Sequence, residues 1–254
     1  DGKRIKLLFD KIEKIKLSED AKKFLDVAIL TNSYFPEKNI TPEEFLEFKS
    51  YYLISNKDFS LIKKYLGNNR NIPTNSILVK YFLEEYFSNS DLKNACSIFD
   101  VVDFVEDDYL SKYKIYCLIN EGQKEEAQLI LDLKKELGFN DSFFEKKFNF
   151  LMGYDSKENT EISEKNILDF HLSHRTNSEF SFTPNQNTKK IIWKYLSSSN
   201  LLEEVDLIDL EDVERIKTIE KATHEGNYTE KELLNLYKRF QFSINQLLTV
   251  KDTY

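Results

Sequence analysis

Two histidines, His171 and His174, lie three residues apart, with Asp169 and Arg175 beside them. On a helix, residues at this spacing share a face, so the two imidazoles could supply two metal ligands or act in acid–base chemistry. A catalytic metal site would need a third ligand from elsewhere, and the HExxH pattern does not occur. We therefore favour the alternative that both histidines are structural and lie near a helix end.

No other motif in the sequence points to catalysis. His224 and Glu225 are adjacent in a turn that ends a helix, where they cannot converge on one substrate atom. The acidic pair Asp107 and Asp108 stands where a helix begins, which the helix dipole explains without chemistry. The chain has no Walker loop, no dinucleotide fingerprint and no G-x-S-x-G motif. We expect a protein that is not an enzyme, with no catalytic residues, no metal ion and no cofactor.

Composition limits the fold class and the kinds of partner. With 6 Gly and 4 Pro in 254 residues, the chain has few of the residues that β-rich folds use in turns, which favours an all-α fold. The 36 basic and 44 acidic residues are interspersed, without the basic cluster that a nucleic-acid binder needs. No run approaches the ~20 apolar residues of a membrane span. We expect neither nucleic-acid binding nor a membrane span.

The cysteines and the first residue bear on the compartment. Cys96 and Cys117 have no metal-site spacing, so the simplest interpretation is two buried small side chains. They fall on consecutive predicted helices, however, and could form a disulfide, which would argue for an oxidising compartment. The chain starts at Asp1 without a methionine, and any signal peptide would lie upstream of it. Cytoplasm and periplasm both stay open, as does the oligomeric state.

Residues 107–138 predict two helices joined by a turn at 121–123. In the second helix, Ala127, Ile130, Leu131 and Leu137 recur at the three- and four-residue steps of one buried face. Such short helices are unstable alone, so the pair must pack against neighbours.

Several residues mark the ends of other helices. Thr41 followed by Glu44, and Thr229 followed by Glu232, have the spacing of capping boxes at helix starts. Gly226 suits the left-handed conformation that follows a helix end.

An internal repeat connects these helices. The turns at 55–58 and 88–91 are similar and lie 33 residues apart, and a further copy follows after 32 residues. Helix-turn-helix units of this length, over residues 43–137, resemble tetratricopeptide-like repeats. The small residue expected inside the first helix is replaced by Tyr116–Cys117 and by Glu84–Glu85, so a looser helical-hairpin solenoid stays open. The resemblance implies a right-handed α–α superhelix.

We assign residues 1–154 to this solenoid. Residues 163–254 are assigned to an irregular helical C-terminal part that could be continuous with it. Within that part, residues 205–210 are expected to be a short extended piece or a loop.

The resemblance also implies a function. Solenoids of this kind are scaffolds that bind a protein or peptide partner on a concave surface, formed by the exposed residues of the first helices. The candidate groove residues on these helices are Lys49, Tyr52, Lys80, Glu84, Lys112 and Tyr116. The pairs Tyr51–Tyr52 and Tyr34–Phe35 could also line a groove. The alternative is the arm of a cell-wall lytic enzyme that handles a glycan polymer, a hypothesis by analogy with soluble lytic transglycosylases.

Overall fold

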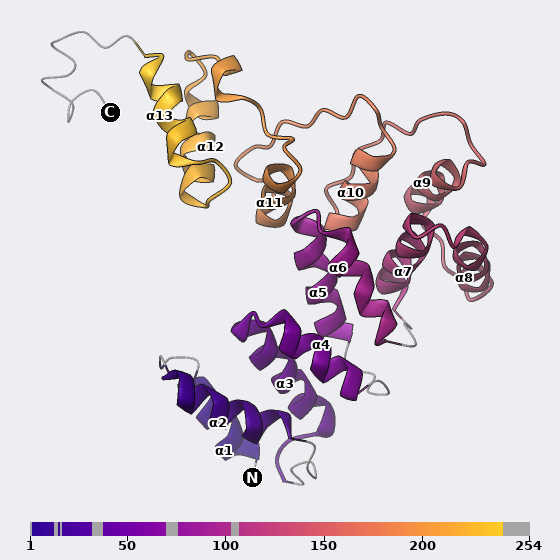
Figure 1. Cartoon of the computed structure of the whole chain (residues 1–254), viewed down its shortest axis with the longest axis vertical. Helices are drawn as coiled ribbons and strands as arrows, with labels where there is room; N and C mark the ends of the chain where they lie inside the picture. The colour runs from indigo at the N-terminus through magenta and orange to yellow at the C-terminus, as the bar shows by residue number, and fades with distance from the viewer. Residues whose placement is uncertain are drawn as a thin grey trace, which may run out of the picture. The chain divides into compact units, whose positions relative to one another are not determined.

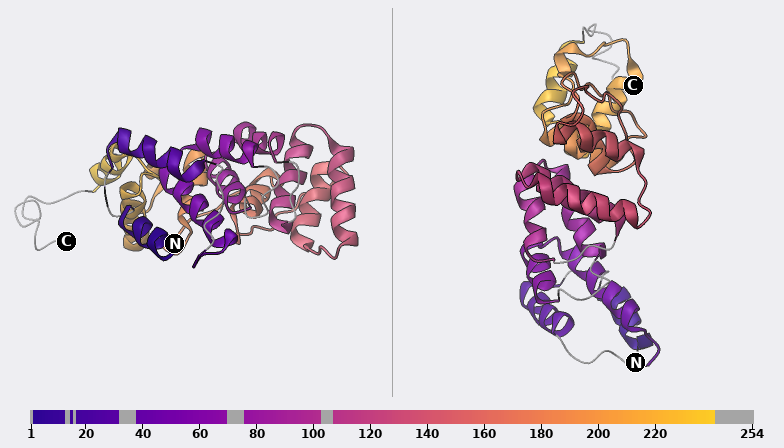
Figure 2. Two further views of the ribbon diagram at one scale, coloured as in Figure 1. Left: turned by 90° about the horizontal axis from the view of Figure 1, so that it is seen from below. Right: turned by 90° about the vertical axis from the view of Figure 1, so that its right-hand side faces the viewer.

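The computed structural model describes residues 2–12, 15, 17–31, 38–69, 76–102 and 107–240. Every regular element in these residues is a helix, and none is a strand (Figures 1 and 2). The predicted all-α class is therefore confirmed. No described helix combines the length and the apolar character needed to cross a bilayer.

The chain divides into two compact units. Unit 1 comprises Asp1–Tyr86 and Leu92–Asp141, and unit 2 comprises Phe87–Asp91 and Ser142–Tyr254. The division into residues 1–154 and 163–254 stays a prediction.

Unit 1 consists of short helices. Its elements are α1 (Gly2–Ile12), α2 (Glu19–Leu30), α3 (Pro42–Asn56), α4 (Phe59–Asn68), most of α5 (Ser76–Ser88), α6 (Leu92–Cys96), the 3₁₀ helix η2 (Ser97–Asp100), α7 (Asp108–Asn120) and α8 (Lys124–Glu136). The pairs α3–α4 and α7–α8 pack together as hairpins. Figure 1 shows α7 and α8 as neighbours.

The predicted helix starts are confirmed. Thr41 accepts a hydrogen bond from the Glu44 backbone, and the Glu44 carboxylate accepts one from the Thr41 backbone, which forms a complete capping box. Thr229 and Glu232 form a second box in the same way. Gly226 has the expected left-handed conformation, with φ of 81°. These local signals act over four residues and depend little on tertiary packing.

The predicted inner face of α8 is only partly correct. Ala127 and Leu131 are buried, but Leu137 is 75% exposed. The reason is helical geometry: Leu137 lies at four-residue steps from Leu129 and Leu133, which also face outward, and not on the face of Ala127 and Leu131.

A disulfide joins Cys96, at the end of α6, to Cys117 in α7, with the two Cα atoms 5.5 Å apart. The simpler interpretation, two separate buried thiols, is therefore wrong for this structure. The bond closes a covalent loop across a sequence separation of 21 residues. It fixes the short α6 against α7 within unit 1.

Unit 2 has irregular connections between its helices. Its elements are α9 (Ser142–Met152), α10 (Ile167–Arg175), α11 (Lys190–Ser198), the 3₁₀ helix η3 (Val205–Leu207), α12 (Val213–His224) and α13 (Glu230–Lys238). The expected extended piece or loop at 205–210 is thus a 3₁₀ turn at its start. Connections 153–166 and 176–189 contain no helix.

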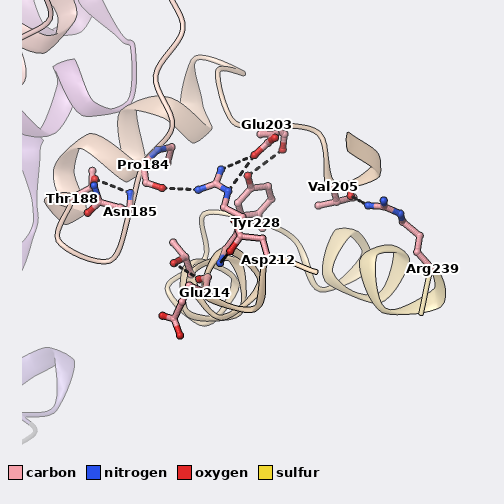
Figure 3. A network of polar contacts seen from close by, with 11 residues as sticks. Pro184, Asn185, Thr188, Glu203, Val205, Asp212, Glu214, Tyr228 and Arg239 are labelled. Carbon is pink, nitrogen blue, oxygen red and sulfur yellow. Dashed lines mark hydrogen bonds and ion pairs between the residues drawn. The ribbon is translucent and has the colours of Figure 1, made fainter. Parts of the chain in front are cut away.

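Side chains fasten these connections to the helices. The Arg215 guanidinium donates to the Pro184 carbonyl and to the Glu203 carboxylate. Tyr228 Oη donates to the Glu203 carbonyl (Figure 3). Arg239 donates to the Val205 carbonyl. Buried carbonyls outside helices need such donors.

Candidate interaction surface

A pocket of about 610 Å³ lies in unit 1, between α1 and the segment that follows it, α2 and the second half of α3. Its walls are mostly apolar and aromatic. The lining residues are Ile12, Ile15, Leu17, Lys22, Phe48, Tyr51, Tyr52, Ser55 and Asn56. The α3 residues reach the same pocket because they recur at three- and four-residue steps. Pockets of this size, with an apolar lining and few polar groups, are typical of ligand-binding sites.

Two adjacent tyrosines of the pocket differ in their surroundings. Tyr52 is buried and its hydroxyl donates to Asp26 Oδ1 over 2.7 Å. Burial, followed by the neighbouring Asp26 carboxylate, raises the pKa of Tyr52 to about 12, so the hydroxyl stays protonated. Tyr51 is 57% exposed. Tyr52 is thus a fixed wall of the pocket, whereas the ring of Tyr51 is available to a partner.

The expected exposure of the candidate groove residues is wrong for four of the six. Lys49, Tyr52, Lys112 and Tyr116 are all buried. The sequence pattern assigned them to the outward face of each first helix, but neighbouring elements cover that face. Whether they take part in binding stays a prediction.

Two of these buried candidates are lysines, and the charge of each is stabilised in a different way. Lys112 Nζ lies 2.9 Å from Asp141 Oδ2, an ion pair within unit 1. Lys49 Nζ lies 5.1 Å from the centroid of the Phe45 ring, and burial lowers its pKa. A cation over an aromatic face is attracted by the ring quadrupole, which offsets part of the cost of desolvation.

The other two candidates meet at a residue that the sequence did not single out. Lys80 is exposed, and its Nζ lies 5.1 Å from the centroid of the Tyr109 ring. Tyr109 Oη donates to Glu84 Oε1 over 3.0 Å, and Lys112 Nζ lies 5.8 Å from the same ring. Tyr109 thus brings three of the six predicted residues together. Tyr52 instead belongs to the pocket.

The two histidines of the possible metal site converge on one hydroxyl. His171 Nδ1 and His174 Nδ1 lie 2.9 and 2.7 Å from Tyr195 Oη. That hydroxyl has one hydrogen, so it can donate to at most one of the two rings and must accept from the other. Burial, and then the Arg175 charge, lowers the pKa of His171 to about 3 and also lowers that of His174. Both rings are therefore neutral at pH 7, and their role depends on a shared hydrogen bond and not on charge at a helix end.

The acidic member of that group points elsewhere. Asp169 Oδ2 accepts a hydrogen bond from Asn166, the N-cap residue of α10. Within the ranges that the structure describes, no three His, Cys, Asp or Glu side chains gather as a metal site.

No family model, no curated protein and no solved structure matches this chain. The interpretation of the pocket therefore depends on its own geometry. The sequence singled out Tyr51 and Tyr52 because they did not fit a buried stripe. Tyr34 and Phe35, singled out for the same reason, lie outside the described residues.

The sequence did not identify Ile12, Ile15 and Leu17 as site residues. Ile12 and Ile15 belong to the apolar stripe of a helix predicted over residues 3–16, and such a stripe predicts burial and not a binding site.

Proposed function

We propose that unit 1 is a protein-interaction module without enzymatic activity, which binds a protein or peptide partner at the pocket around Tyr51. The observation that carries the proposal is an exposed tyrosine at the opening of a mostly apolar pocket of about 610 Å³. Tyrosine is enriched among residues that dominate binding energy, because its ring supplies a large contact area and its hydroxyl a polar contact.

The hairpins α3–α4 and α7–α8, together with the repeat of 32 to 33 residues, support a scaffold of tetratricopeptide-like units. We include the right-handed superhelix in this proposal. In such a scaffold each hairpin packs on the next, and side chains from several helices can line one binding surface. The pocket, formed by α1, α2 and α3, has this character.

Photo-crosslinking from the pocket tests the proposal. A photoreactive phenylalanine analogue replaces Tyr51 in one variant and Tyr154 in another. Tyr154 is the matched control, because it is a 64% exposed tyrosine outside the pocket. We expect a discrete protein or peptide adduct at position 51 that is absent at position 154, and an unchanged melting temperature. The same adducts at both positions, or none at position 51, would contradict the proposal.

Two observations favour a second candidate, a glycan-handling arm. The disulfide Cys96–Cys117 is typical of oxidising compartments, where cell-wall polymers occur. The pocket also combines aromatic rings with the polar side chains of Lys22, Ser55 and Asn56. Sedimentation with purified peptidoglycan is the test. Binding that Tyr51→Ala removes would support this function, and an absence of binding would exclude it.

A further inference from the structure

The last helix of unit 1 has an apolar outward face. Leu129, Leu133 and Leu137, along α8 and its C-terminal cap, are 68%, 54% and 75% exposed. Residues four apart share a helix face, so these three leucines form a continuous α8 stripe. Ala127 and Leu131, on the opposite face, are buried. The α8 stripe therefore takes no part in the buried core of unit 1.

Carboxylates border the α8 stripe. Glu125, Glu126, Asp132 and Glu136 are exposed, and at 3.6 residues per turn they project beside the leucines. A partner that covers the stripe must present apolar side chains flanked by positive charge, because desolvated like charges oppose association.

The first helix of unit 1 has such a face. Leu7 and Leu8 of α1 are 60% and 57% exposed. Lys3, Arg4 and Lys11 are exposed as well, and Arg4 and Lys11 project between the two leucines on the helical circumference. The outward face of α1 is thus apolar and basic, where that of α8 is apolar and acidic.

We infer that α1 of one copy of this chain docks on the α8 stripe of a second copy. The outer faces of α1 and α8 each combine exposed leucines with exposed charges of one sign, basic on α1 and acidic on α8, so the two faces complement each other. Because the two faces differ, the contact is heterologous and leaves one free surface of each kind, so copies add head to tail into open chains or closed rings. This assembly goes beyond the proposed pocket function, since the pocket uses Ile12 of α1 and not Leu7 or Leu8.

Sedimentation velocity of the full chain over a range of concentrations measures the association. We expect the mean mass to rise with protein concentration and to fall at high salt, which screens the charged borders. Leu129→Gln with Leu133→Gln removes one surface, and Leu7→Gln with Leu8→Gln removes the other. Each double variant should weaken association by about tenfold for every leucine that is replaced.

Mixing the two double variants tests the geometry. The α8 variant retains an intact α1, and the α1 variant retains an intact α8 stripe, so the mixture should form 1:1 dimers that grow no further. Symmetric pairing of two α8 stripes predicts the opposite, because the α1 variant would associate alone and mixing would restore nothing. That result would overturn the inference.

Controls separate association from folding. Leu207→Gln with Leu234→Gln alters two exposed leucines of unit 2, which are 73% and 52% exposed, and should leave the mass distribution unchanged. Circular dichroism should show equal helicity in all variants. As a second approach, Arg4→Glu with Lys11→Glu should weaken association, and Glu125→Lys with Glu126→Lys in the other copy should restore it. A wild-type chain that is monomeric at every concentration, or an α8 variant that associates normally, refutes the inference.

Discussion

The described hairpins of unit 1 and the connections of unit 2 are stabilised in different ways. In unit 1, helix N-caps such as Asp58 and Asp107, short turns and one disulfide hold the hairpins. In unit 2, polar side chains on helices donate to carbonyls of the irregular connections, as Lys147 and Arg215 do. The comparison shows that tight turns between helices can be stabilised by residues close in sequence. Long connections instead require specific long-range hydrogen bonds.

Lys147 is the extreme case in unit 2. It is completely buried, and its Nζ donates to the carbonyls of Asn159 and Glu161 over 2.7 and 2.8 Å. The same Nζ lies 5.1 Å from the centroid of the Phe143 ring. Burial lowers the pKa of Lys147 to about 8. The cost of burying this amine is offset by the two carbonyls that it satisfies.

The largest expected effect comes from Lys147→Met. The substitution keeps the apolar stem but leaves two carbonyls without their donor, at about 2 kcal/mol each, so the free energy of unfolding should fall by about 4 kcal/mol. Denaturant titration measures this loss, and hydrogen exchange should place it in residues 142–176.

Lys146→Met is the matched control for Lys147. Lys146 is 60% exposed and pairs with Glu161 over 3.5 Å, so its loss should change stability by less than about 1 kcal/mol. Equal effects at the two lysines would remove the distinction that we draw between the units.

The second-largest expected loss of stability is in unit 1. Cys96→Ala with Cys117→Ala should lower the free energy of unfolding by about 3 kcal/mol, because the bond restricts a loop of 21 residues in the unfolded chain. Hydrogen exchange should place the loss in α6 and α7. Reducing agent should have the same effect on the wild type and none on the variant. Titration of two free thiols in the unreduced native protein would contradict the bond.

The smallest of the three effects depends on pH and belongs to unit 2. His171 has a folded-state pKa near 3, below its ordinary value of 6.5, because burial disfavours the charged ring. Its contribution to stability is complete above pH 6.5 and is lost as the pH falls toward 3. At pH 5 the loss is about 2 kcal/mol. Thermal unfolding at pH 7 and pH 5 measures it.

His171→Gln should flatten this pH dependence, since the amide does not titrate. His224→Gln is the control, because His224 is exposed at the end of α12 and should leave the dependence as it is. If the wild type keeps its stability at pH 5, the buried pair is not the acid-sensitive part of unit 2.

Much of the helical framework follows from the sequence alone. Capping boxes at Thr41 and Thr229 gave correct helix starts, since the signal and the structure both lie within four residues. Buried stripes gave most inward residues, such as Ala127 and Leu131. Leu137 failed because the pattern allowed two faces, and only neighbouring helices decide which one is covered.

The candidate site was less predictable. Lys49 and Lys112 were assigned to an exposed groove because charged residues are normally solvated, yet an aromatic ring and a carboxylate make their burial possible. Tyr109 was missed, since its role depends on side chains from α5 and α7 meeting in space. The shared Tyr195 hydroxyl depends on α10 and α11 in the same way.

The disulfide also has a mechanical consequence. When the chain is pulled from its two ends, the segment between Cys96 and Cys117 cannot extend. At full extension that segment would add roughly 70 Å to the length of the chain. A reduced molecule should therefore stretch farther than an oxidised one by about this amount, so the bond sets how far unit 1 can yield under force.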